Sequence, residues 1–136
     1  PLNGMIAEAL KVGGVVAMKD PTRGGLANTL NEWTSKSKVN LEIQHKDIPL
    51  RDGVSNACDL LGINPLSIGN EGKAVIGCVP EMADQIVKAL RRTKEGANAA
   101  IIGYAVEGPV RVILRTEIGG RRILDPPAGD PVPRIC

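Results

Sequence analysis

The sequence predicts an α+β domain, residues 1–124, in which helices cover a mixed β-sheet, followed by an extended arm, residues 125–136. Three observations support this prediction. Apolar residues switch along the chain between helical spacing and strand spacing, which favours helices packed on a sheet. The last apolar segments before the arm are typical of strands. Four of the final twelve residues are proline, which excludes a helix interior or a central strand there.

The predicted helices are the segments in which apolar residues recur every three or four positions. In chain order they span approximately residues 3–12, 26–38, 54–61 and 80–95. Their ends carry capping signals: Thr22 is the predicted N-cap of the second helix, Gly62 ends the third, and Pro80 opens the fourth. The basic residues near the end of the fourth helix complement its dipole, so we do not interpret them as a binding patch.

The predicted strands are short apolar runs, or segments of period two, between turn-forming residues. In chain order they span residues 15–18, 39–44, 73–79, 100–106, 110–115 and 122–124. Apolar and polar residues alternate from Val39 to Gln44, which indicates a half-buried strand. Gly119 and Gly120 predict a two-residue hairpin turn before the last strand.

Composition excludes several classes of function. The net charge of +2 does not indicate a nucleic-acid or membrane-surface partner, and no apolar run approaches 18 residues, so a cytoplasmic location is expected. The three cysteines have the spacing of neither a disulfide framework nor a zinc site. Cys58 and Cys78 are interpreted as small buried apolar residues, and His45 as a solvated loop residue.

A loop between a predicted strand and a predicted helix, residues 19–25, carries the most suggestive internal motif, Lys-Asp-Pro-Thr-Arg-Gly-Gly. This arrangement presents backbone N–H groups and the positive end of a helix to an anion. Arg23 would add a forked donor suited to phosphate. Glycines at such a turn serve tight packing equally often, so both interpretations stand at this point.

A second loop, residues 69–72, places Glu71 between Asn70 and Gly72. Glycine allows backbone and substrate to approach closely. A carboxylate in such a loop is either a solvated surface group or a candidate general base.

The arm ends in a cysteine, Cys136. Its prolines favour a stiff, extended chain, which at roughly 3.1 Å per residue would reach over about 30 Å. Either the thiol is a reactive group that is delivered from one site to another, or the arm is a frayed terminus that happens to end in cysteine.

Three stretches together resemble the C-terminal half of the HypE family of hydrogenase maturation proteins, in the PurM-like superfamily. They are residues 18–27, residues 69–73, and the terminal Pro-Val-Pro-Arg-Ile-Cys, residues 131–136. The first two are shared in looser form with selenophosphate and aminoimidazole-ribonucleotide synthetases. The proline arm with its final cysteine distinguishes HypE, and the resemblance implies a PurM C-terminal-like fold.

The resemblance implies a carbamoyl dehydratase that uses ATP and Mg²⁺. Cys136 would receive a carbamoyl group from the carbamoyltransferase HypF, and its S-carboxamide would be dehydrated to a thiocyanate. Cyanide would then pass to iron on the HypC–HypD scaffold. By the motif match, Glu71 is the general base with Asn70 beside it. The first loop would face the phosphates through Asp20, Thr22, Arg23, Gly24 and Gly25, and whether Asp20 touches metal stays open.

The family's N-terminal half, which would form the homodimer and supply most ATP and Mg²⁺ contacts, is absent from this sequence. We therefore expect this chain to fold without turning over ATP. Two alternatives remain: the C-terminal domain of another PurM-like ATP-dependent enzyme, or a non-catalytic interaction domain whose arm docks into a partner groove.

Overall fold

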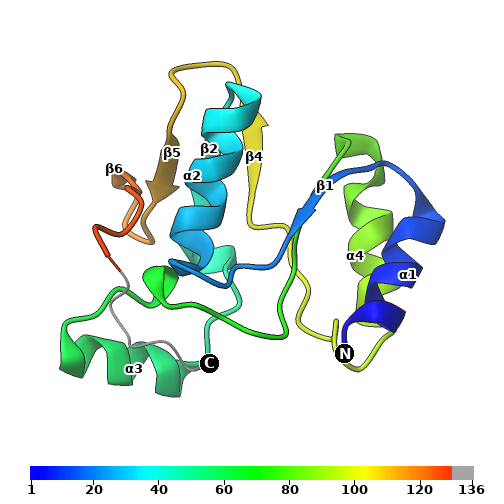
Figure 1. Ribbon diagram of the computed structural model, residues 1–136, viewed down its shortest axis with the longest axis horizontal. Helices are drawn as coiled ribbons and strands as arrows, with labels where there is room; N and C mark the ends of the chain where they lie inside the picture. Colours follow the sequence, from blue (N-terminus) through cyan, green and yellow to red (C-terminus); the bar gives the residue numbers. More distant parts are fainter. Residues whose placement is uncertain (130–136) are drawn as a thin grey trace. The chain divides into compact units, whose positions relative to one another are not determined.

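The structure, a computed structural model, describes residues 1–129 (Figure 1). The chain forms two compact units, each assembled from two separate stretches of sequence. Unit 1 comprises Pro1–Asp20 and Gly72–Ile101, and unit 2 comprises Pro21–Glu71 and the chain from Ile102 onward. Each unit therefore has its own architecture.

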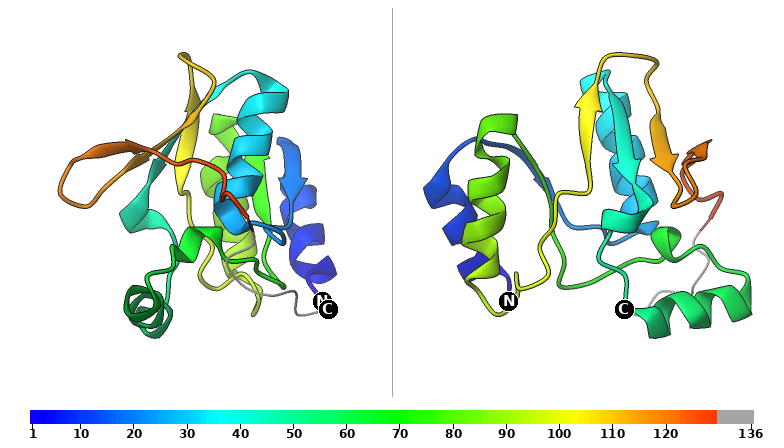
Figure 2. Two further views of the ribbon diagram at one scale, coloured as in Figure 1. Left: turned by 60° about the vertical axis from the view of Figure 1, so that its left-hand side comes forward. Right: turned by 180° about the vertical axis from the view of Figure 1, so that it is seen from behind.

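Unit 1 pairs two helices and two strands. Its elements are α1 (Asn3–Val12), β1 (Val15–Lys19), β3 (Val75–Cys78), the 3₁₀ turn η3 (Pro80–Met82) and α4 (Ala83–Arg91). Helices α1 and α4 lie side by side (Figure 2) and share a core of Met5, Ala9, Ile86 and Leu90. The strands β1 and β3 form an antiparallel pair. The helical spacing of the sequence identified both halves of this core.

Unit 2 contains a four-stranded sheet in the order β4-β2-β5-β6. Its strands are β2 (Asn40–Gln44), β4 (Gly103–Val106), β5 (Val112–Arg115) and β6 (Arg121–Ile123). β2 runs parallel to β5, and the other pairs are antiparallel, so the sheet is mixed. Helix α2 (Gly25–Ser37) lies along one face of this sheet (Figure 1). The core of unit 2 lies beneath this helix, where Val112 and Leu114 have no exposed surface.

The alternation predicted for β2 is confirmed from Leu41 to Gln44, whereas Asn40 at the start of the strand is buried although it is polar. Leu41 and Ile43 are buried, whereas Glu42 points to the opposite face because successive strand side chains alternate. On that face, Glu42 Oε2 lies 2.9 Å from Arg115 Nη2 on β5, and its Oε1 lies 2.7 Å from Arg121 Nη2 on β6. These partly exposed pairs contribute at most about 1 kcal/mol each. Their main effect is to favour one register across three strands.

The connecting segments of unit 2 are largely short helices. They are the 3₁₀ turn η1 (His45–Asp47), α3 (Asp52–Leu61) and the 3₁₀ turn η2 (Pro65–Ser67). Gly62 follows α3 in the left-handed conformation, with φ 64°, and confirms the predicted helix end. In η2, the side chain of Asn64 accepts a hydrogen bond from the Leu66 N–H at 3.0 Å. This bond fixes the loop that carries the second motif.

Two predictions about chain turns are wrong in detail. The fourth helix does not begin at Pro80: η3 comes first, with a Met82 N–H to Val79 O bond of 3.1 Å, and α4 follows from Ala83. The hairpin between β5 and β6 has a three-residue loop, closed by a Thr116 N–H to Gly120 O bond of 2.8 Å. Gly119 takes φ 84° as its last residue, so a left-handed third position replaces the predicted two-residue turn.

The predicted fold class is confirmed, with mixed strand pairing and four α-helices. The structure adds that the strands of residues 1–129 divide between two sheets, since within this range β1 and β3 pair only with each other. Residues 125–129 form no helix or strand, and the rest of the predicted arm lies outside the described residues. No helix within residues 1–129 is both long and apolar enough to cross a membrane.

Candidate functional site

The first loop of the site enters helix α2 through two glycines in the left-handed conformation. Gly24 has φ 69° and occupies the N-cap position, and Gly25 has φ 62°. The prediction that Thr22 caps α2 is wrong, because Gly24 occupies the N-cap position and no side chain of the described residues caps this helix. Instead, the backbone carbonyl of Thr22 accepts the N–H of Gly25 at 3.3 Å. A backbone hydrogen bond thus closes the turn before α2, and the first turn of the helix has no side-chain cap among the described residues.

The second loop packs directly against the first. The N–H of Asn70 donates to the carbonyl oxygen of Pro21 at 2.9 Å. A Cβ at Gly69 would overlap the carbonyl oxygen of Thr22. A Cβ at Gly25 would overlap the carbonyl oxygen of Ile68. Glycine is therefore required on both sides of this contact. Although Pro21 and Asn70 are 49 positions apart in sequence, the parts of the two motifs that lie in unit 2 form one site.

The predicted polar residues occupy different positions around this contact. The side-chain amide of Asn70 donates to the Ile68 carbonyl at 3.0 Å, so it holds the second loop in shape. Glu71 follows it and is exposed, as is Arg23 on the first loop. Among the described residues, neither Arg23 nor Glu71 makes an ion pair. Both charges are accordingly available to a substrate.

Two predicted site residues are not brought to this contact. Asp20 is exposed and belongs to unit 1, so it is not part of the contact that the two loops of unit 2 make. Cys136 lies outside the described residues. The remaining predicted residues, Thr22, Arg23, Gly24, Gly25, Asn70 and Glu71, all belong to unit 2.

Two asparagines of α2 were missed by the sequence analysis. The side-chain amide of Asn28 donates to the carbonyl of Arg23 at 3.2 Å, across the start of the helix. The amide of Asn31 donates to the carbonyls of Ala27 and Leu124, each at 2.8 Å. Asparagine is a poor helix former, so its presence inside a helix is a signal that a side-chain hydrogen bond offsets this cost. For Asn28 that bond is local, whereas for Asn31 it includes the tertiary bond to Leu124.

The remaining cysteines are free thiols within unit 1 and unit 2. Cys58 is 5% exposed, as predicted, and Cys78 is half-buried. Burial raises the pKa of the Cys78 thiol, which favours its unreactive protonated form. Neither thiol resembles an activated nucleophile.

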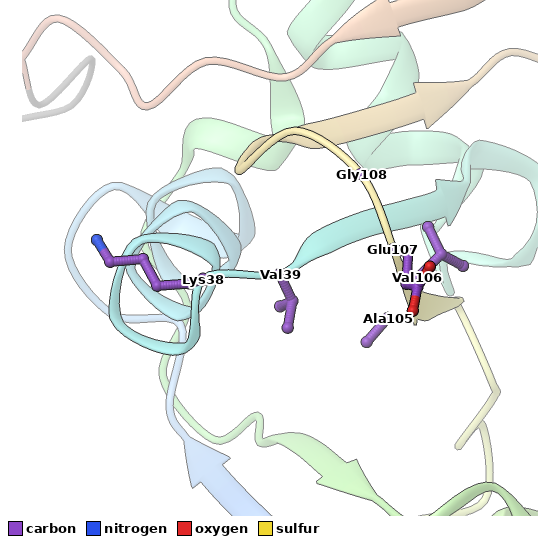
Figure 3. A pocket seen from close by; sticks show the side chains of 6 residues that line it. All are labelled: Lys38, Val39, Ala105, Val106, Glu107 and Gly108. Carbon is purple, nitrogen blue, oxygen red and sulfur yellow. The ribbon is translucent and has the colours of Figure 1, made fainter.

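Two cavities of unit 2 are lined by residues outside the two loops. One, of about 390 Å³, lies between the end of α2 and strand β4 (Figure 3) and is lined by Lys38, Val39, Ala105, Val106, Glu107 and Gly108. Another, of about 470 Å³, includes His45, Cys58 and Arg122 in its lining. His45 Nδ1 is 3.6 Å from Glu117 Oε1, so the residue is not simply solvated. No predicted site residue lines either cavity.

The donor set fits a phosphate better than a metal. In the described part of the chain the first turn of α2 has no side-chain cap, and the exposed Arg23 lies directly before it, at the positive end of the helix dipole. Within residues 1–129, no three His, Cys, Asp or Glu side chains gather to hold a metal ion. Mg²⁺ in nucleotide sites usually keeps several waters and binds one or two carboxylates and the phosphates. The exposed guanidinium of Arg23 therefore suits an anion such as a phosphate.

The fold and this pair of loops define a class of protein. The chain belongs to the family described as AIR synthase related protein, C-terminal domain, which matches residues 2–115. Its curated relatives are hydrogenase maturation proteins. A hydrogenase expression/formation protein of Methanocaldococcus jannaschii is 48% identical, covering 100% of this chain and 41% of its own length. The carbamoyl dehydratase HypE of Rhizobium leguminosarum bv. viciae is 43% identical, covering 99% of this chain and 39% of its own length.

Solved structures give the same result. Escherichia coli HypE matches with a TM-score of 0.93 and 36% identity, over 99% of this chain and 42% of that one. HypE in complex with ATP matches with a TM-score of 0.89 and 34% identity, over 95% of this chain and 41% of that one. The HypE–HypF complex matches with a TM-score of 0.89 and 34% identity, over 93% and 42%.

These comparisons confirm the resemblance to HypE that the three sequence motifs indicated. They also bear out the PurM-type fold. The chain spans about two fifths of the length of the curated relatives that it matches.

Proposed function

We propose that this chain is the C-terminal domain of a carbamoyl dehydratase that converts an S-carbamoylated Cys136 into a thiocyanate at the expense of ATP. One observation carries the proposal: the Pro21–Gly25 loop and the Gly69–Glu71 loop are joined by the Asn70 to Pro21 hydrogen bond of 2.9 Å. This contact sets a candidate phosphate-binding loop next to a candidate base. The carbamoyl dehydratases among the relatives and the ATP complex of HypE support the same reading.

The proposed reaction balances as S-carboxamide plus ATP to thiocyanate, ADP, phosphate and a proton. ATP, as substrate, supplies the phosphoryl group that makes the carboxamide oxygen a good leaving group. The residues of the first loop would bind the phosphates: Arg23 through its guanidinium, and Gly24 and Gly25 by forming the tight turn that holds Arg23 at the start of α2. The first loop would stabilise the negative charge of the phosphates without changing its own conformation, because two left-handed glycines and the packed second loop fix its backbone.

Glu71 would act as the general base that removes the remaining N–H proton as the oxygen leaves. Its carboxylate is exposed at the end of a loop that is held in place by Asn70, so its backbone is positioned while its side chain is free to meet a substrate. Asn70 would then have a positioning role through its two hydrogen bonds to Ile68 and Pro21. Thr22 would contribute its backbone carbonyl to the turn of the first loop.

The proposal includes the remaining members of the system. HypF would be the carbamoyl donor for Cys136, in keeping with the HypE–HypF complex among the structural relatives. A HypC–HypD scaffold would accept the cyanide, Mg²⁺ would accompany ATP, and the enzyme would act as a cytoplasmic homodimer through its N-terminal half. These four points rest on the resemblance to HypE.

The deciding experiment follows the C-terminal peptide by mass spectrometry. Full-length protein is incubated with the carbamoyltransferase, carbamoyl phosphate and ATP, and we expect Cys136 to gain a carboxamide and then to lose the mass of water. A cysteine that stays an unmodified thiol in an otherwise active system would overturn the proposal. Cys136→Ala then separates the alternatives, because an interaction domain with a docking arm would tolerate this change.

The base assignment has its own test. In Glu71→Gln the side chain keeps its size but loses its basicity, so carbamoylation should proceed while dehydration falls by about 100-fold or more. The carboxamide should accumulate in the mass spectrum. Thiocyanate formed at the wild-type rate would remove Glu71 from this role.

A further inference from the structure

The chain leaves the sheet of unit 2 at a firmly held residue, Leu124. Its side chain is 3% exposed. Its N–H donates to the carbonyl of Val112 on β5 at 2.9 Å, and its carbonyl accepts from the side-chain amide of Asn31 on α2 at 2.8 Å. Both backbone groups and the side chain of Leu124 are therefore engaged, so the arm starts from a fixed point.

Asn31 is committed to this contact. Its amide nitrogen has two N–H donors, and it donates to two carbonyl oxygens, those of Ala27 and Leu124. Because both partners are acceptors, the nitrogen rather than the oxygen must face them, which fixes the orientation of the amide. The Ala27 bond lies within the helix, whereas the Leu124 bond joins residues 93 positions apart.

A second contact lies three residues further along. A Cβ at Gly24 would lie 3.0 Å from Cγ of Pro127, so the chain passes closely over the N-cap of α2. Pro127 is half-buried there, whereas its neighbour Pro126 is exposed. The start of the arm can be followed beside α2 in Figure 2. Leu124 and Pro127 thus attach the arm to the helix whose first turn belongs to the candidate site.

We propose that Asn31 is a positioning residue that, together with the Gly24 to Pro127 contact, directs the arm to the site loops of its own molecule. This inference rests on the proposed function. Attachment at Leu124 alone leaves twelve residues to the terminal thiol, and attachment at Pro127 leaves nine. The effective concentration of a tethered group depends on the length and the starting point of its tether, so these attachments favour dehydration within the molecule.

The test measures two steps separately in full-length protein. Under the proposal, carbamoylation involves an external donor, whereas dehydration requires the arm to reach the site of its own molecule. In Asn31→Ala we expect dehydration at saturating ATP to slow about fivefold, with an unchanged KM for ATP and an unchanged rate of carbamoylation. The matched control is Thr34→Val on the same helix, which loses the hydroxyl bond to the Asn31 carbonyl but no contact with the arm.

A second pair of variants does not touch the core. Pro127→Ala removes the contact over Gly24 and should slow dehydration about twofold to threefold. Pro126→Ala makes the same chemical change at an exposed position and should have a smaller effect. Comparing the two cancels the general effect of losing a proline on the stiffness of the arm.

The outcomes separate the two proposals. Wild-type thiocyanate formation combined with an unimpaired Asn31→Ala variant would overturn the positioning role and leave the proposed function intact. Equal losses in Asn31→Ala and Thr34→Val, or equal losses in both reaction steps, would also overturn it, because a purely structural role predicts them. A wild-type protein that forms no thiocyanate overturns the proposed function and the positioning role together.

Discussion

Unit 2 contains two Gly-Gly segments, residues 24–25 before α2 and residues 119–120 in the β5–β6 hairpin, and they differ in how closely other atoms approach them. A Cβ at Gly25 would overlap the carbonyl oxygen of Ile68, whereas a Cβ at Gly119 would meet no atom within 4 Å. Both residues have positive φ, 62° and 84°. In the hairpin, backbone conformation alone explains the glycine. In the loop before α2, close approach of a second loop explains it as well, and this approach builds the candidate site.

The largest effect is expected at the crowded glycine. Gly25→Ala combines a left-handed φ with a clash against two backbone carbonyls, so we expect a loss of about 3 kcal/mol in the free energy of unfolding. Urea unfolding followed by the fluorescence of Trp33, the single tryptophan, measures it. A loss below about 1 kcal/mol would mean that the two loops separate easily.

A smaller effect is expected at the open glycine. In Gly119→Ala the added Cβ meets no other atom, so the only cost is the left-handed conformation. We expect the free energy of unfolding to fall by about 1 kcal/mol. Gly119→Asn should lose less, because asparagine tolerates this conformation. Equal losses for the two glycines, in the same urea titration, would remove the distinction between crowding and conformation.

The smallest effect should have the opposite sign. Gly53 lies in α3 with no atom within 4 Å of an added Cβ and no positive φ. Gly53→Ala should therefore stabilise the chain by about 0.5 kcal/mol, since alanine restricts the unfolded chain and favours the helix. Thermal unfolding gives the sign directly, and a lower melting temperature would contradict it.

The elements of the fold could be predicted because their signals are local. Helix α1 has the predicted bounds, and the alternation in β2 identified its buried face. The division into two sheets could not be predicted, since β2 pairs with β5 across residues 45–111 and no local pattern encodes that choice. Thr22 had the right residue type for an N-cap, but two left-handed glycines moved the start of α2 past it.

The sequence motifs singled out residues of the candidate site, but they did not predict how its two loops pack together. The sequence singled out Arg23 and Glu71 by their motifs. Their loops lie close together through backbone contacts, which the identities of the side chains do not indicate. Asn31 was missed because its function is a bond to a carbonyl 93 residues away. Asparagine inside a helix is unfavourable, so its presence there indicates a hydrogen bond that offsets the cost.

The parallel pairing of β2 with β5 also bears on the order in which the chain folds during synthesis. β2 ends at residue 44, and its neighbours begin at residues 103 and 112. At about 5–20 residues per second, a nascent β2 waits several seconds for any strand partner. Helix α2 is made first, and its apolar stripe can cover Leu41 and Ile43 in the meantime. The helix that carries the candidate site would then protect the newborn chain from aggregation.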